Sequence, residues 1–297
     1  MSTTTDRRAT QKPAVVAFHL TPPPVRAAFG ILERAAPRLG GRWARRIWFR
    51  LPPDPGPRPG PDRRTGALFT VRAGRTDVVG EVWGEGPTVL LVHGWAGHRR
   101  QFDAFVAPLV ARGHRVVTFD APSHGDSPAG RYGPRSSSLP EFVTAVTAVA
   151  GTYGPVHAVV AHSMGATATA LALGDGVRPA RIAMLAPMAS VTSYARRFVA
   201  GLGAGERVHA RLVAGIERRV RAPLEAFEVP PLGAVVEPPP TLVVHDEGDP
   251  SVPVAEGAAI AAAWPGARLS VTRGLGHRRI ARDPRVVAEV VDFVTAV

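Results

Sequence analysis

The 297-residue chain contains no cysteine, which excludes disulfide bonds, thiolate zinc sites, iron–sulfur clusters and a cysteine nucleophile. It also lacks any apolar run near the ~20 residues that a membrane-spanning helix needs. Charged residues make up 20% of the chain and apolar residues 45%, a balance typical of globular proteins and not of disordered or collagen-like ones. The length suits one large domain with an insertion, or two domains.

Lysine is almost absent, because Lys12 is the single lysine among 36 basic residues. The formal net charge is +12, and residues 1–64, with 13 Lys/Arg against 4 Asp/Glu, contribute +9 of it. A basic surface of this kind is typical of proteins that bind nucleic acid or anionic membranes. Because the charge is concentrated in the N-terminal segment, we expect no nucleic-acid partner and no stable membrane insertion. Surface association through this segment stays an open alternative.

Residues 1–66 are predicted to form an extension outside the main domain. Residues 1–14 are polar and predicted to be disordered, and the apolar stretch 14–20 is too short for a signal-peptide core, so we expect a cytoplasmic protein. Residues 25–51 predict one or two basic amphipathic helices packed on the main domain, and the proline-rich residues 52–61 predict a stiff linker. A membrane-surface role for the helices is less favoured, because glycine and proline interrupt their apolar stripe.

From residue 67 onward, apolar runs suited to strands alternate with helical patterns. The first two runs lack an intervening helix and predict an antiparallel pair, whereas the rest predict a mostly parallel sheet with helices on both faces. The expected strands are 67–71, 78–83, 89–92, 116–119, 158–160, 182–185, 242–244 and 269–272. The expected helices are 100–112, 139–153, 164–173, 255–264 and 284–294.

One long segment breaks this alternation. Between the sixth and seventh apolar runs, helical patterns occur at 194–203 and 206–221 without a convincing strand. We therefore predict an α/β core formed by residues 67–187 and 237–297. Residues 188–236 are predicted to form a helical cap inserted between strands six and seven.

The pentapeptide Ala161-His162-Ser163-Met164-Gly165 follows an apolar run and opens a helical pattern of small residues. Such a strand–turn–helix is typical of a nucleophile elbow, in which the strained nucleophile requires small neighbours. Gly165 meets this requirement, and Ala161 adds only a methyl group where glycine is usual. The alternative is that Ser163 merely caps the helix.

The segment His93-Gly94-Trp95-Ala96-Gly97 follows another expected strand, and its glycines allow a turn that points a backbone N–H inward. In acyl-transfer enzymes such a loop supplies one oxyanion donor, and the residue after the nucleophile supplies the other. We assign these donors to the N–H groups of Trp95 and Met164. The alternative is that this segment is a turn with no catalytic role and that Trp95 lines a pocket.

Two further loops at strand ends contain acidic residues and a histidine. Asp246, Glu247 and Asp249 compete for one position, and Asp249 is preferred because it lies in the turn just before a proline. His277 lies on a glycine-rich loop and is the only histidine after His245, so it alone completes the order Ser…Asp…His. Functional sites of open α/β sheets gather at the strand ends where these loops meet.

Together these segments resemble the α/β-hydrolase fold of serine enzymes over residues 67–297. The resemblance rests on His93-Gly94-Trp95, Phe119–Ser127, Ala161–Gly165, Asp249-Pro250 and Gly276-His277. It implies Ser163, Asp249 and His277 as the catalytic triad and the insertion as a cap over the acyl pocket. It also implies that residues 120–127 are mainly structural, and it says nothing about the N-terminal extension.

The favoured interpretation is a serine hydrolase that cleaves carboxylic esters of small or medium acyl groups through an acyl-enzyme, without a cofactor or metal. An acyltransferase, thioesterase, peptidase or cofactor-free perhydrolase with the same triad is the alternative, because motifs do not fix the acyl acceptor. A non-catalytic binding protein of this fold is less favoured, because all triad residue types and both oxyanion loops are present.

Overall fold

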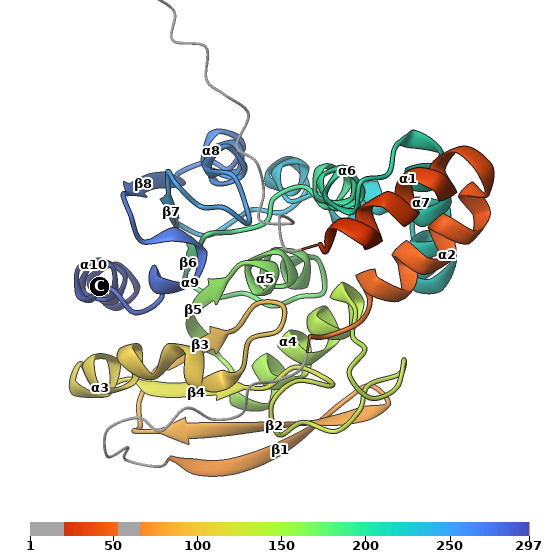
Figure 1. Ribbon diagram of the computed structural model, residues 1–297. Helices are drawn as coiled ribbons and strands as arrows, with labels where there is room; N and C mark the ends of the chain where they lie inside the picture. Colours follow the sequence, from red (N-terminus) through yellow and green to blue (C-terminus); the bar gives the residue numbers. More distant parts are fainter. Residues whose placement is uncertain (1–20, 53–65, 297) are drawn as a thin grey trace, which may run out of the picture.

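The computed structural model describes residues 21–52 and 66–296. The predicted disorder of residues 1–14 falls outside the described residues. The apolar stretch 14–20, which is too short for a signal-peptide core, also lies outside them. So does all but the first residue of the linker 52–61. The described part forms one sheet covered by helices, and a helical lobe projects from it (Figure 1).

The sheet has eight strands in the order β1-β2-β4-β3-β5-β6-β7-β8, so each expected strand is present. β1 and β2 pair antiparallel, as predicted, and β2 also pairs antiparallel with β4, whereas all other neighbours are parallel. The loops after the parallel strands therefore leave the sheet at one edge. The strands are β1 (Ala67–Ala73), β2 (Thr76–Trp83), β3 (Thr88–Val92), β4 (Arg115–Phe119), β5 (Val156–His162), β6 (Arg181–Leu185), β7 (Thr241–Asp246) and β8 (Arg268–Thr272).

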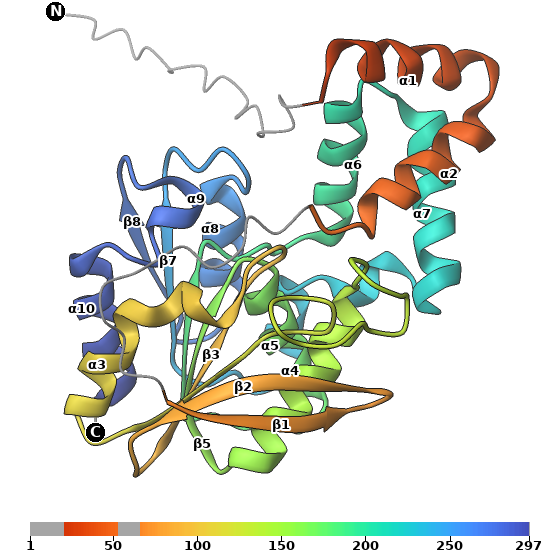
Figure 2. The same ribbon diagram turned by 60° about the horizontal axis from the view of Figure 1, so that its bottom comes forward.

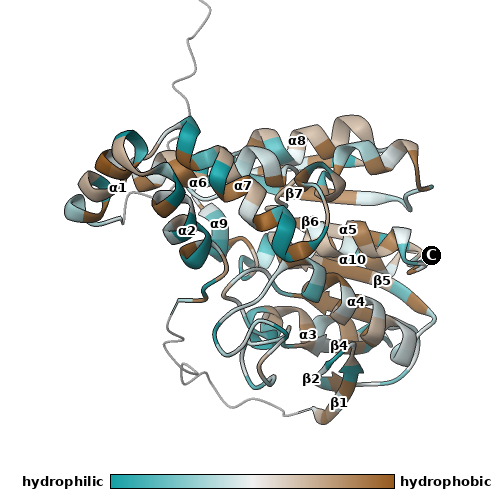
Figure 3. Cartoon of the chain, turned by 90° about the vertical axis from the view of Figure 1, so that its right-hand side faces the viewer, coloured by the Kyte–Doolittle hydropathy of each residue, from teal (hydrophilic) through white to brown (hydrophobic). Residues whose placement is uncertain are grey.

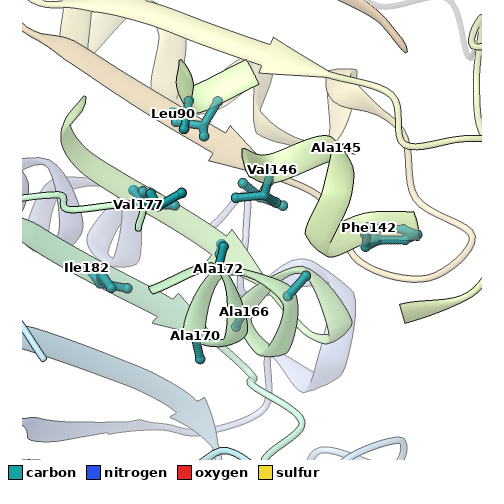
Figure 4. Close-up of a cluster of buried hydrophobic side chains, with 14 of the residues drawn as sticks. Leu90, Phe142, Ala145, Val146, Ala166, Ala170, Ala172, Val177 and Ile182 are labelled. Atoms are coloured by element: carbon teal, nitrogen blue, oxygen red, sulfur yellow. The ribbon is translucent and has the colours of Figure 1, made fainter. Parts of the chain in front are cut away.

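Helices cover both faces of the sheet and enclose two apolar cores. Leu90 and Val92 of β3 belong to the core shared with α4, α5 and α8, part of which is drawn in Figure 4. Val89 and Leu91 belong to the core shared with α3 and α10. The strands are apolar along their whole length because helices bury both faces of the sheet. Figure 3 shows these hydrophobic strands between the helical layers. The helices are α3 (Asp103–Ala111), α4 (Leu139–Tyr153), α5 (Met164–Gly174), α8 (Val254–Ala263) and α10 (Pro284–Thr295).

The insertion between β6 and β7 forms α6 (Val191–Leu202) and α7 (Glu206–Val220). Glu256 on α8 fixes its beginning, because one carboxylate oxygen accepts hydrogen bonds from the N–H groups of Ala189 (2.9 Å) and Ser190 (2.7 Å). The other oxygen pairs with Arg197 of α6 at 2.7 Å. These buried contacts tie the start of α6 to the α/β core.

The N-terminal segment forms α1 (Pro23–Ala35) and α2 (Pro37–Trp48), which pack mainly on α6 and α7 and not on the sheet layers (Figure 2). Glu33 of α1 caps α7 by accepting hydrogen bonds from the N–H groups of Gly205, Arg207 and Val208 at 2.9–3.0 Å. Burial raises the pKa of Glu33, but these backbone donors lower it below its usual range. The N-terminal helices and the insertion therefore form one lobe.

Two glycines that interrupt the apolar stripe of α2 allow it to approach α7 closely. A Cβ at Gly41 would overlap the Cβ of Arg211 and lie 3.1 Å from its carbonyl carbon. A Cβ at Gly40 would lie 2.7 Å from Cγ2 of Val208. The glycines thus serve helix packing and do not mark an end of the helix.

We expect Gly41→Ala to lower the free energy of unfolding by about 1–3 kcal/mol, the usual cost of overpacking a filled contact. Gly151→Ala is the matched control, because this position also lies in a helix but the added Cβ would meet no neighbouring atom within 4 Å. The control should stabilise the protein by about 0.5–1 kcal/mol. Urea unfolding followed by circular dichroism measures both, and equal effects would contradict the close contact of α2 with α7.

Candidate active site

Ser163 lies between β5 and α5 in a strained backbone conformation, with φ of 54° and ψ of −124°. Such strain is costly for a residue with a Cβ and is typical of functional sites. Its N–H donates to the carbonyl of Leu185 at 2.9 Å. A Cβ at Gly165 would overlap the carbonyl oxygen of His93 and lie 2.6 Å from that of Val92, so the elbow requires glycine there.

His277 connects Ser163 to Asp249 through two hydrogen bonds. Nε2 of His277 lies 3.0 Å from Oγ of Ser163, and Nδ1 lies 2.7 Å from Oδ2 of Asp249. Ser163 is 8% exposed and Asp249 4%, so both contacts are largely shielded from water. The Ser163 side chain makes no capping hydrogen bond to α5, and its hydroxyl therefore faces His277.

Asp249 is held as an acceptor by its surroundings. Its second oxygen, Oδ1, accepts hydrogen bonds from the N–H groups of Ser251 (2.7 Å) and Val252 (2.9 Å). Burial raises the pKa of Asp249, but the hydrogen bonds from His245 and His277 lower it well below its usual range. The side chain is therefore a carboxylate at neutral pH.

The two competing acidic residues have other partners. Asp246 accepts hydrogen bonds from the hydroxyl of Thr272 and the N–H of Leu275, both at 2.9 Å. Glu247 forms an exposed ion pair with Arg273 at 3.1 Å. Asp246 therefore holds the loop after β8 in place, whereas Glu247 stays at the surface.

His162 supports the main chain at His277. Nε2 of His162 donates to the carbonyl oxygen of His277 at 2.7 Å, and the two ring centroids lie 4.7 Å apart. Burial, followed by the charge of His277, lowers the pKa of His162 to about 3, so its ring is neutral at pH 7. His277 lies in a short helical turn, α9 (Gly276–Arg279), where the sequence predicted a loop.

The loop after β3 lies directly against Ser163. A Cβ at Gly94 would lie 2.8 Å from the Cβ of Ser163, so this approach depends on glycine. No acceptor in the described residues takes a hydrogen bond from the N–H of Trp95 or of Met164. The indole ring of Trp95 packs edge-on against His124, with ring centroids 5.7 Å apart.

Two buried histidines hold this loop in shape. The N–H of Ala121 donates to Nε2 of His93 at 2.9 Å, and the N–H of Ala96 donates to Nε2 of His124 at 3.2 Å. Nδ1 of each ring donates to a nearby main-chain carbonyl. Burial lowers the pKa of His93 to about 4 and that of His124 to about 3, which keeps both rings neutral.

Arg99 is a further buried residue that the sequence patterns did not indicate. It pairs with Asp120, with Asp126 at 2.6 Å and with Glu81 at 3.3 Å. The backbone N–H of Arg99 also donates to Asp120 at 2.6 Å. These bonds join the loop after β3 to the loop after β4, in keeping with the structural role that the resemblance implies for residues 120–127. Buried charges of this kind have no periodic pattern by which a sequence could reveal them.

Among the described residues, no three His, Cys, Asp or Glu side chains lie close enough together to hold a metal ion. Within the same ranges, no helix is both long and apolar enough to cross a membrane.

A family model described as the alpha/beta hydrolase family matches residues 89–290. Because this match covers more than half of the chain, the protein belongs to the alpha/beta hydrolase family. A non-heme haloperoxidase from Rhodococcus erythropolis is 31% identical over 97 residues, which are 33% of this chain and 35% of that protein. The matched part thus spans about a third of the relative's length.

Solved structures share the fold at low sequence identity. A bromoperoxidase from Bacillus anthracis superposes with a TM-score of 0.58 and 16% identity, over 77% of this chain and 99% of that chain. An esterase from Rhodococcus sp. ECU1013 has a TM-score of 0.57 and 20% identity, over 77% of this chain and 98% of that chain. These likenesses confirm the expected α/β-hydrolase fold.

We expect the protein to lose stability as the pH falls from about 7 to about 4. The folded pKa values of His93, His124 and His162, about 4, 3 and 3, lie below the ~6.5 of an unfolded chain. The unfolded state therefore binds more protons in this window, and acid favours it. His124→Gln removes one such group and should reduce the slope of unfolding free energy against pH by up to about 1.4 kcal/mol per pH unit. Urea titrations at several pH values measure the slope, and an unchanged slope would contradict a neutral buried His124.

Proposed function

We propose that the protein is a serine hydrolase that cleaves carboxylic esters through an acyl-enzyme. The observation that supports this most is the hydrogen-bonded series Ser163–His277–Asp249 at the sheet edge of an alpha/beta hydrolase family member. Oγ of Ser163 attacks the acyl carbonyl while Nε2 of His277 accepts its proton. Asp249 keeps Nδ1 of the ring protonated and stabilises the imidazolium that forms.

The oxyanion that develops is bound by the N–H groups of Trp95 and Met164. The N-terminus of α5 directs the positive end of its helix dipole to the same place. His277 then returns the proton to the leaving alcohol and activates a water molecule, which releases the acid. Met164 also packs against the apolar cluster of the lobe, which includes Met188 and Phe198, and these apolar side chains near Ser163 favour an apolar acyl group.

A second candidate function replaces water with peroxide as the acyl acceptor. The partial similarity to a non-heme haloperoxidase and the fold shared with a bromoperoxidase favour it. Hydrogen peroxide would attack the same acyl-enzyme at Ser163 and release a peracid. Both candidate functions require the same nucleophile, base and oxyanion donors.

We expect Ser163→Ala to lower kcat/KM for p-nitrophenyl acetate by about 10⁴-fold or more, because the covalent path is lost. A fluorophosphonate probe should label Ser163 in the wild-type protein and leave the variant unlabelled. Ser270→Ala is the matched control, since Ser270 lies on the outer strand β8 and its hydroxyl donates to Glu289 of α10 at 3.0 Å. This variant should retain wild-type turnover. Ester hydrolysis that persists in Ser163→Ala would refute the nucleophile assignment.

We expect the acyl-enzyme to react with water in preference to other acceptors. Esters of increasing acyl length are tested with water alone and with added hydrogen peroxide, and both acid and peracid are quantified. Acid as the main product supports the esterase. Peracid as the main product at millimolar peroxide would instead establish the second candidate, and both products should disappear in Ser163→Ala.

A further inference from the structure

One face of α2 exposes both arginine and apolar side chains to solvent. Arg42 and Trp43 lie three and four residues after Leu39, and Arg46 lies four and three residues after them, so the four side chains share one side of the helix. Leu39 is 55% exposed and Trp43 37%. The ring of Trp43 stacks on the buried Phe29 of α1, with centroids 4.5 Å apart, and its outer part forms a small apolar patch with Leu39 among the arginines.

This face borders a groove of about 700 Å³ between α2, the loop near residue 135 and the end of α7. A smaller cavity of about 170 Å³ lies next to it, between α2 and α7. We call the two together the arginine groove, because Arg42 and Arg45 border both. Its other arginines are Arg38, Arg46, Arg50, Arg135, Arg211, Arg218 and Arg219.

Most of the positive charge of the arginine groove has no carboxylate beside it, although Glu141 interacts electrostatically with Arg219. No aspartate or glutamate lines either cavity, and none of these arginines forms an ion pair with a carboxylate of the described residues. Arg219 stacks over the rings of Phe49 and Tyr132, 4.7 and 4.2 Å from their centroids. Burial, and then the like charges of Arg219, Arg218 and Arg42, lower the pKa of Arg45. An anion bound in the groove would relieve the repulsion among these four arginines.

The mixture of side chains distinguishes between possible anions. Guanidinium groups bind phosphate oxygens in pairs, which suits free phosphate, nucleic acid and lipid head groups alike. Of these three, a membrane surface takes up both Leu39 and Trp43, because tryptophan and aliphatic side chains are stabilised at the boundary between head groups and acyl chains, whereas nucleic-acid bases would stack on Trp43 alone. α1 and α2 lie on the outside of the lobe that projects from the sheet (Figures 1 and 2), where a flat surface has access.

We propose that the arginine groove docks the protein on membranes that contain anionic phospholipids, with lipid phosphates among the guanidinium groups and with Leu39 and Trp43 in the head-group layer. Docking of this kind is peripheral and strengthens with each arginine near the surface. It is independent of the proposed ester hydrolysis, because it uses none of the residues around Ser163.

The test uses the full-length protein and sedimentation with vesicles. One set of vesicles is phosphatidylcholine alone, and the other contains about one third phosphatidylglycerol, at low salt. The protein should bind the anionic vesicles only and dissociate as salt is added. Arg42→Glu/Arg46→Glu should weaken the partition at least about tenfold. Arg273→Glu/Arg285→Glu changes the same charge at exposed positions outside the lobe and should bind like the wild-type protein.

A second substitution separates the membrane from soluble phosphate. Leu39→Gln leaves every charge in place and should weaken vesicle binding several-fold without changing its salt dependence. Turnover of a soluble ester, measured in parallel, should stay at the wild-type rate in the variants at residues 39, 42 and 46, so loss of docking and loss of catalysis are recorded separately. Circular dichroism of each variant reports that it is folded.

Three results would overturn the proposal. The first is no binding to anionic vesicles at low salt. The second is equal loss of binding in the Arg42→Glu/Arg46→Glu and control pairs, which would indicate net charge alone. The third is binding of inorganic phosphate or a short DNA duplex through Arg42 and Arg46 without vesicle binding, which would assign the groove to a soluble anion.

Discussion

The hydrogen bond between His277 and Asp249 is the contact on which the geometry of the site depends. Asp249 follows β7 and His277 follows β8, and His277 lies 114 residues from Ser163 along the chain, so only tertiary contacts can align them. Asp246 and His162 hold the same segment through the N–H of Leu275 and the carbonyl of His277. Because a charge-assisted hydrogen bond is stronger and more directional than a neutral one, the imidazole has one favoured orientation toward Ser163.

Histidine has two different functions around this site. The imidazole of His277 has both ring nitrogens directed at polar side chains and is only part-buried. His93 and His124 are buried neutral rings that connect one loop to another through backbone groups. Burial penalises the charged form of His93 and His124, so each of these rings stays neutral and acts as a fixed pair of donor and acceptor. The loop beside Ser163 is thus held in place by the hydrogen bonds of His93 and His124.

The sequence predicted the strands and most helices because these depend on local patterns, continuous apolar runs and helical spacing. Ser163, Asp249 and His277 could also be proposed from the sequence, because each follows an expected strand and the three occur in the order Ser…Asp…His. Other contacts between distant segments could not be predicted. Neither the capping of α7 by Glu33 nor the support of His277 by His162 leaves a periodic signal. The helical turn at residues 276–279 is too short to produce one.

The apolar cluster of the lobe is built from two distant parts of the sequence, the N-terminal segment and the insertion between β6 and β7. Phe29, Ala44 and Phe49 of the N-terminal segment pack with Phe198 and Leu212 of the insertion in one buried core. The family match begins only at residue 89, so the first two helices look dispensable when the chain is compared with its relatives. Removing them would strip one side from that core and leave hydrophobic surface in water. A truncated protein would therefore be prone to aggregate even with every residue around Ser163 intact.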